Sequence, residues 1–193
     1  MDDIVIAALR KWPQVPDCRG WLALDARGDW FLRDDRAQAT GPFPAVKGSR
    51  VEHEGLRNFI ARNYEHDTGG AWFFQNGPQR VYVELEATPW VWRIDCVESA
   101  RAGAAWTITS HTGLSANHEH ALLDERGRLF LATDRGLGLV HTLDMQAASD
   151  AIEAGVWTPV EVRSADLPRR YGYRLSPAAD AFPPLVPPVT SPR

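Results

Sequence analysis

The sequence predicts an α+β fold made of two related halves, each a β-hairpin sheet with a helix, packed together. Three features predict this fold. Apolar runs flank turn residues at several places, a pattern typical of β-hairpins. One hairpin pattern occurs twice, about half a chain apart. Each copy precedes a segment with the apolar spacing of an amphipathic helix.

The composition is that of a globular protein with its own core. Of the 193 residues, 44% are hydrophobic and 24% are charged, so disorder is not expected. The 21 Lys and Arg residues are scattered among 25 Asp and Glu residues, and the formal net charge is -4. Because nucleic acids and anionic membranes bind clustered basic surfaces, we expect neither as a partner.

The N-terminal residues and the cysteines favour a cytoplasmic protein. The chain begins with acidic residues where a secretory signal would be basic. No segment approaches the roughly 18–20 apolar residues of a membrane span. Cys18 and Cys96 lie far apart and in no metal-binding spacing, so we expect both to be free thiols.

The first half is predicted to begin with a helix over residues 2–11, which following prolines end. A hairpin over residues 21–32 turns between Asp25 and Gly28, because Asp can bond its own downstream backbone and Gly accepts a positive φ. Residues 36–50 are rich in Gly and Pro and are predicted to form a loop.

Ser49 and Glu52 have the spacing of a capping box, which predicts a helix over residues 51–64. A second hairpin is expected over residues 72–85, and alternation predicts a strand over residues 90–96.

The second half is predicted to contain a strand over residues 104–110, a hairpin over 120–131 and a helix over 144–154. Strands over 160–162 and 171–175 are expected to complete it. The predicted division of the chain is an N-terminal half (1–100), a C-terminal half (101–176) and a proline-rich tail (177–193). The tail is expected to form neither helix nor ladder.

The two halves share a turn motif. Leu24-Asp25-x-Arg27-Gly28-x-x-Phe31-Leu32 occurs again as Leu123-Asp124-x-Arg126-Gly127-x-x-Phe130-Leu131. Both the turn residues and the flanking apolar positions correspond, which favours related halves over a chance recurrence.

Several further motifs follow one another in a defined order: Arg27-Gly28-Asp29-Trp30, a helix with Leu56 and Phe59, Gly70-Ala71-Trp72-Phe73-Phe74, Ala87-Thr88-Pro89-Trp90, Leu129-Phe130-Leu131-Ala132-Thr133 and Pro159-Val160-Glu161-Val162-Arg163. In this order the chain resembles a proteobacterial family of unknown function, domain-of-unknown-function family 1285. The resemblance implies an α+β fold with repeated motifs and a role in signalling. It implies no catalytic residue. The loop over residues 36–48 and the proline-rich tail depart from the family.

Three histidines form the one metal-like group in the sequence. His118 and His120 would share one face of a strand, the spacing of a two-histidine clasp, and His111 or Asp124 could supply a third ligand. The alternative is a loop with solvated histidines at its edge. No other cofactor is indicated.

Eight tryptophans are a large number for this length. Trp90 and Trp92 would face one side of a strand, and Tyr82 would lie nearby in the preceding strand. These three residues could line a groove for a flat ligand or a peptide. The alternative is a tryptophan-rich core.

Other catalytic patterns are weak. No Gly-x-Ser-x-Gly elbow occurs. Gly136 and Gly138 give a Gly-x-Gly without the third glycine of a dinucleotide site.

We therefore predict a non-catalytic ligand- or protein-binding module with a role in signal transduction. Its unknown partner would be a small molecule, a peptide or a protein, held where the halves meet, and a homodimer stays open. One alternative is a metal-dependent hydrolase that uses His111, His118 and His120. Another is an adaptor whose proline-rich tail docks on a partner.

Overall fold

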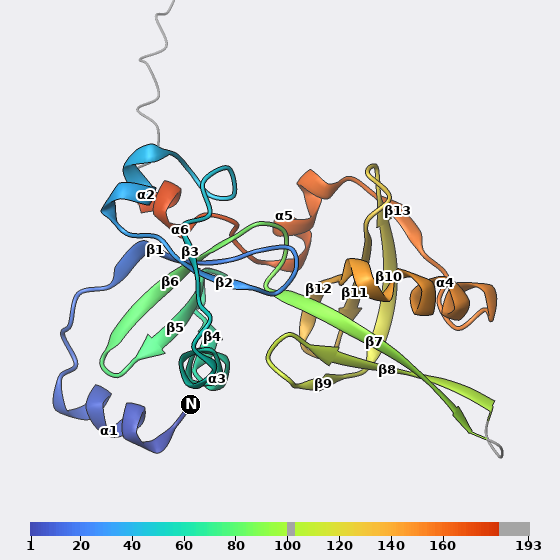
Figure 1. The fold of residues 1–193 in the computed structure, drawn as a ribbon, viewed down its shortest axis with the longest axis horizontal. Coiled ribbons are helices and arrows are strands. Elements are labelled where there is room, and N and C mark those ends of the chain that lie inside the picture. The colour runs from blue at the N-terminus through green and yellow to red at the C-terminus, as the bar shows by residue number, and fades with distance from the viewer. Residues whose placement is uncertain (100–102, 182–193) are drawn as a thin grey trace, which may run out of the picture.

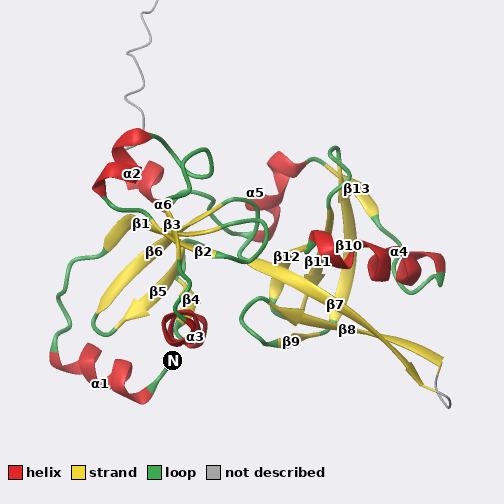
Figure 2. Ribbon diagram, in the orientation of Figure 1, coloured by secondary structure: helices red, strands yellow, loops and turns green. Residues whose placement is uncertain are grey.

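The computed structural model describes residues 1–99 and 103–181, which form two mixed β-sheets with short helices around them (Figures 1 and 2). The predicted α+β class with two sheet halves is confirmed. The chain passes from the first sheet to the second between Leu85 and Trp90. The division at residue 100 stays a prediction.

The first sheet has six strands in the order β3-β2-β1-β6-β5-β4. Strands β1 and β6 are parallel, and the other neighbours are antiparallel. The predicted hairpins over 21–32 and 72–85 are present as β1–β2 and β5–β6. The sequence patterns did not predict β3 or β4, two short strands that pair with β2 and β5. The strand bounds are β1 Cys18–Leu24, β2 Trp30–Leu32, β3 Ser49–Arg50, β4 Tyr64–His66, β5 Trp72–Asn76 and β6 Gln79–Leu85.

The second sheet has seven strands in the order β13-β10-β11-β12-β7-β8-β9. Strand β10 is parallel to β13, and β12 is parallel to β7. The predicted hairpin over 120–131 is present as β10–β11. The strand bounds are β7 Trp90–Ser99, β8 Gly103–Ser110, β9 Ser115–Ala116, β10 His118–Asp124, β11 Leu129–Thr133, β12 Gly136–Val140 and β13 Val160–Val162.

The helices agree with the sequence in part. They are α1 Asp3–Lys11, α2 Asp35–Thr40, α3 Glu54–Arg62, α4 Met145–Glu153, α5 Leu167–Tyr171 and α6 Pro177–Ala181, with 3-10 turns η1 Thr142–Asp144 and η2 Ser164–Asp166. The predicted capping box is wrong, because Ser49 lies in β3 and His53 caps α3 through Nδ1, which accepts the Leu56 amide at 3.1 Å.

Three segments differ from the prediction. Helix α2 forms inside the predicted loop, because Asp34 caps it by accepting the Ala37 amide. The predicted strand 171–175 is wrong: proline in the first turn favours α5, and Gly172 ends that helix at φ +66°. The tail begins with a helix, α6, since Pro177 suits the first helical position. Residues 182–193 of the predicted tail lie outside the described residues.

The core runs from one sheet into the other through stacked aromatic rings. Trp30 and Trp72 come from the first sheet, and Trp90 and Trp92 come from the second. Tyr64 touches three of these rings, with centroid separations of 5.1 Å to Trp30, 4.7 Å to Trp72 and 5.7 Å to Trp90. Four of the eight tryptophans therefore belong to the core that joins the two sheets.

The C-terminal segment returns from the second sheet to the first. The Leu85 amide donates to the Leu175 carbonyl at 2.7 Å, and α6 then packs on β1 and β6 (Figure 1). Glu84, which is buried in β6, accepts the Ser176 hydroxyl and, at 3.1 Å, the Ala178 amide. No helix in residues 1–99 or 103–181 is long and apolar enough to cross a membrane.

Candidate functional site

Two hairpin turns with the same hydrogen bonds flank the junction of the sheets. In the first turn, Asp25 Oδ1 accepts the amides of Arg27 and Asp29 at 2.9 and 3.0 Å. In the second turn, Asp124 Oδ1 accepts the amides two and four positions later at 3.0 and 2.8 Å. The glycines that close the turns have φ of +81° (Gly28) and +72° (Gly127), which L side chains rarely adopt. The shared sequence motif thus produces a shared geometry.

A pocket of about 440 Å³ lies between these turns, and we refer to it as the junction pocket. The first half contributes its turn, the end of the 36–48 loop and the segment after β6. The second half contributes its turn, β12 and the start of η1 and α4. The lining residues are Ala26, Arg27, Lys47, Glu86, Gly127, Arg128, Leu129, Leu139, Val140, Thr142 and Met145.

Lys47 connects the loop to the first turn. Its Nζ lies 2.8 Å from Asp25 Oδ2 and 3.2 Å from Glu86 Oε2. Burial by itself lowers the pKa of Lys47, but the hydrogen bonds to the two carboxylates raise it above its ordinary value. Glu86 also accepts the Ala26 amide at 3.1 Å. Lys47 is therefore charged and fixed at the rim of the junction pocket.

Arg128 is the cation that binds the aspartate of the second turn, as Lys47 does in the first. Its Nε lies 2.8 Å from Asp124 Oδ2, and its guanidinium lies 5.3 Å from the centroid of the Phe130 ring. The Asp124 side chain is fully buried, whereas that of Arg128 is 30% exposed. The guanidinium edge that Asp124 does not use is thus available to a ligand.

The side of the pocket made by the second sheet is apolar. Leu129, Leu139 and Val140 are each at most 4% exposed and belong to the core. Met145, at the start of α4, is 37% exposed and covers the edge of this wall. The junction pocket therefore has a charged side and an aliphatic side.

A charged network next to the pocket fixes η1 and α4. Arg93 donates to Asp144 through Nε at 2.6 Å and through a terminal nitrogen at 3.0 Å, and the Ile94 amide donates to Asp144 at 3.1 Å. Burial raises the pKa of Asp144, but the hydrogen bond from Arg93 holds it below its ordinary value. His141 Nδ1 accepts the Leu143 amide at 3.1 Å, and burial lowers the pKa of His141. These bonds hold Thr142 and Met145 at the pocket.

The three residues predicted to bind a flat ligand do not lie together. Trp90 and Trp92 stack at 5.8 Å, but they are only 6% and 0% exposed. Their ring nitrogens donate to the carbonyls of Arg135 at 2.8 Å and Leu131 at 2.9 Å. Tyr82 packs in a separate small cluster with Phe73 and donates to Asp67 at 3.0 Å. A binding role for these residues stays a prediction.

The three histidines predicted to bind a metal lie in three different environments. His111 packs against Trp30, Tyr64 and Trp90, with ring centroids 5.4 to 6.0 Å away. His118 stacks on Trp157 at 5.6 Å, and His120 is exposed. Across residues 1–99 and 103–181, no three His, Cys, Asp or Glu side chains are arranged to hold a metal ion.

His111 has one unusual nitrogen. Its Nδ1 accepts the Val91 amide at 3.3 Å, so the proton of the neutral ring lies on Nε2. That nitrogen is buried and has no hydrogen-bond partner in the described part of the chain. Burial lowers the pKa of His111 to about 3. At neutral pH the ring is an uncharged part of the aromatic core.

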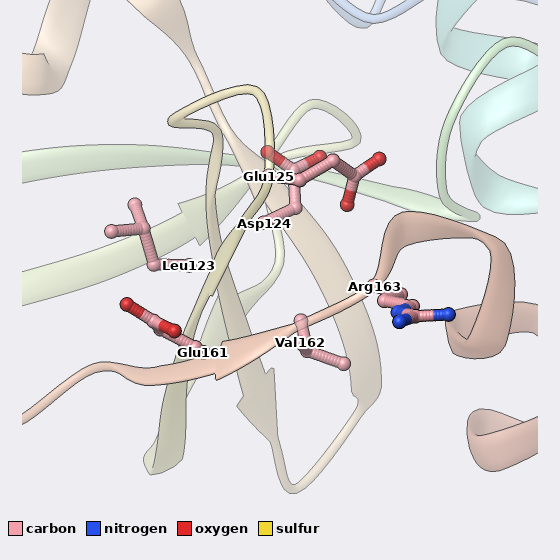
Figure 3. A pocket seen from close by; sticks show the side chains of 6 residues that line it. All are labelled: Leu123, Asp124, Glu125, Glu161, Val162 and Arg163. Atoms are coloured by element: carbon pink, nitrogen blue, oxygen red, sulfur yellow. The ribbon is translucent and has the colours of Figure 1, made fainter.

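A larger depression of about 480 Å³ lies at the edge of the second sheet, beside β13. Figure 3 shows that Glu161 and Arg163 point away from one another there. Glu125 is occupied by Ser164, whose amide and hydroxyl donate to it at 2.8 and 2.6 Å. Asp124 is occupied by its own turn. Because its polar groups are used internally or diverge, this depression is a weaker candidate than the junction pocket.

Family membership follows from the sequence as a whole. Residues 1–178 match the profile of a family described as "Protein of unknown function (DUF2946)". The chain belongs to this family. The description of the DUF2946 family names no activity.

Two solved structures are similar to this DUF2946 chain. One is a DUF1285 family protein from Silicibacter pomeroyi, 13% identical, with 78% of this chain and 84% of that chain covered and a TM-score of 0.49. The other is a DUF1285 family protein from Shewanella baltica, 14% identical, with 67% and 91% covered and a TM-score of 0.41. Both carry the family name that the motifs had indicated, so the predicted resemblance is confirmed. Comparison with curated proteins gives no match.

Sequence reasoning identified the two turns but not the pocket between them. Lys47 lies 22 positions after Asp25, inside a loop without a motif. Arg128 lies within the second turn, and the first turn has Asp29 at the corresponding place. The recurrence of the turn motif was the one signal that pointed to this part of the molecule.

Proposed function

We propose that this DUF2946 protein is a non-catalytic binding module whose small-molecule ligand lies in the junction pocket. The observation that carries the proposal is that two turns with the same hydrogen bonds, each beside a fixed cation, face an aliphatic wall. A site of this kind fixes a polar group and buries an apolar one, as small-molecule sites generally do. Both halves line the pocket, so a bound ligand would bridge them. That property suits the signalling role that the family resemblance implies.

The alternative, a metal-dependent hydrolase, has less support. It needs several ligands around one ion, and His111 is enclosed by the rings of Trp30, Tyr64 and Trp90. The junction pocket itself lacks a nucleophile beside a base among its described lining residues.

The proposal is tested by purifying the protein gently from its own cells and measuring its native mass. We expect a stoichiometric extra mass in the wild type. Met145→Trp should lose this mass, because the indole would fill the pocket. Gln146→Trp is the matched control, since residue 146 is exposed and does not line the pocket. A bare wild-type mass, or an extra mass that Met145→Trp retains, would contradict the proposal.

A further inference from the structure

We infer that the ligand of the junction pocket is a monocarboxylate with an aliphatic chain, anchored by Arg27. This inference rests on the proposed function and adds the chemical class of the ligand. It follows from which charges around the pocket are already neutralised and from which side chains form its wall.

Two of the three lining cations are already paired. Lys47 is shared by Asp25 and Glu86, and Arg128 is held by Asp124. Each of these cations faces a carboxylate at 2.8 Å, so they supply donors of fixed direction but little net positive charge. They can orient an anion, but they cannot balance its charge.

Arg27 is different. It is exposed on the first turn and lines the pocket, and no carboxylate of residues 1–99 or 103–181 forms an ion pair with it. The acidic residue two positions later, Asp29, is taken by Arg50 at 2.6 Å. At the corresponding place in the second turn, Arg126 lies 3.9 Å from Glu125.

One unpaired guanidinium matches one carboxylate. The planar fork of Arg binds both oxygens of a carboxylate at once, which gives direction as well as charge. A phosphate dianion would bring a second negative charge into a region where three carboxylates (Asp25, Glu86 and Asp124) already face the two paired cations, one carboxylate more than those cations neutralise. The charge balance therefore favours a monoanion.

The wall specifies the rest of the ligand. Leu129, Leu139, Val140 and Met145 offer an aliphatic surface, and no aromatic ring is among the described residues that line the pocket. A flat ring would find no stacking partner there, whereas each CH₂ of an alkyl chain buried against this surface adds favourable binding free energy. Met145 is unbranched and can adapt to the end of such a chain.

The test uses four probes: octanoate, 1-octanol, octyl phosphate and acetate. Each is titrated calorimetrically into wild type, Arg27→Gln and Arg36→Gln. Arg36 is the matched control, because it is an exposed arginine of α2 outside the pocket. We expect octanoate to bind wild type and Arg36→Gln equally and to bind Arg27→Gln at least tenfold more weakly. Octanol, octyl phosphate and acetate should each bind wild type at least tenfold more weakly than octanoate.

Several outcomes would overturn the inference. They are equal binding of octanol, equal or tighter binding of octyl phosphate, unchanged octanoate binding by Arg27→Gln, or no octanoate binding by wild type. Any of these would leave the proposed function intact if wild type still retains a native mass that Met145→Trp loses. Arg27→Lys is a second control, for loss of folding in Arg27→Gln. It keeps the positive charge but lacks the planar guanidinium, so it should bind octanoate with intermediate affinity.

Discussion

Asp25 and Asp124 hold two hairpin turns with the same set of bonds. In each residue Oδ1 accepts two backbone amides of its own turn, and Oδ2 accepts a cation at 2.8 Å. The cation is Lys47 in one case and Arg128 in the other. These two carboxylates lie 99 positions apart in the chain (124 − 25). Each orders the backbone of its own turn, and together they fix the two cations at the rim of one pocket.

We expect Asp25→Ala and Asp124→Ala each to lower the free energy of unfolding by about 2–3 kcal/mol, because each leaves two amides and a cation without their acceptor. Urea unfolding measures this loss. Asp166→Ala is the control, since its contact with Arg169 is 3.9 Å and exposed, and it should change stability by less than about 0.5 kcal/mol. Equal losses in all three variants would show that the turns carry no special stability.

The hairpins could be predicted from sequence because their signals are local. Asp25 and Gly28 specify a turn by bonds within five residues, and the flanking strands alternate. Helix α4 was predicted for the same reason. Strand β4 could not be, because three residues become a strand only by pairing with β5. The parallel pairing of β1 with β6 likewise depends on residues more than 60 positions apart, such as Leu22 and Val83.

The site was harder to predict than the fold. Trp90 and Trp92 do share one side of a strand, as alternation predicted, but sequence cannot tell whether that side faces solvent or another sheet. For the junction pocket, the decisive residues come from a loop, two turns and a helix start. No spacing rule relates Lys47 to Met145.

Gly138 is predicted to tolerate no side chain, because the ring of Trp92 lies against its Cα. A Cβ at this position would lie 2.3 Å from Nε1 of Trp92, a fully buried ring that donates to the Leu131 carbonyl at 2.9 Å. We expect Gly138→Ala to cost about 3 kcal/mol or more in thermal or urea unfolding. Gly127→Ala provides the comparison: a Cβ there meets nothing within 4 Å, so only its φ of +72° is unfavourable, at about 1 kcal/mol. A smaller loss for Gly138→Ala than for Gly127→Ala would contradict this account.

The two sheets should unfold together, because their aromatic rings form one core. Tyr64 and Trp72 of the first sheet contact Trp90 of the second. Tryptophan fluorescence and far-ultraviolet circular dichroism should therefore give coincident transitions. Trp90→Ala should lower the stability of the whole molecule by about 3–5 kcal/mol. Trp12→Ala, which removes a ring that is 51% exposed, should have an effect below about 1 kcal/mol. Separate transitions for the two probes would show that the halves are independent.

His111 is predicted to make the fold sensitive to acid. Its folded pKa of about 3 lies below the value of 6.5 expected for an unfolded chain. The stability that depends on its neutral form is therefore complete above pH 6.5 and is lost as the pH falls from 6.5 toward 3, by up to about 1.4 kcal/mol per pH unit.

His111→Asn can still accept the Val91 amide but does not titrate. It should be less stable than wild type at pH 7 and should lose less stability between pH 6 and pH 4. Denaturant unfolding at several pH values measures both quantities. His120→Asn, at an exposed position, should keep the wild-type slope. An unchanged slope in His111→Asn would mean that the buried ring does not control acid stability.

Glu125 should titrate far below an ordinary glutamate. The Ser164 hydroxyl and amide donate to its carboxylate at 2.6 and 2.8 Å, and these bonds, the hydroxyl first, lower the pKa of Glu125 to about 2. A folded pKa below the usual 4.5 means that the bonds stabilise the fold above pH 4.5 and that this contribution fades as the pH falls toward 2. Ser164→Ala removes the hydroxyl but keeps the amide, so the pKa should rise part of the way to its ordinary value, as an NMR titration of the Glu125 side chain would show. Ser149→Ala, remote on α4, should leave it unchanged. If wild-type Glu125 titrated near 4.5, Ser164 would not hold it, and its carboxylate at the edge of the second sheet would be free to meet a ligand.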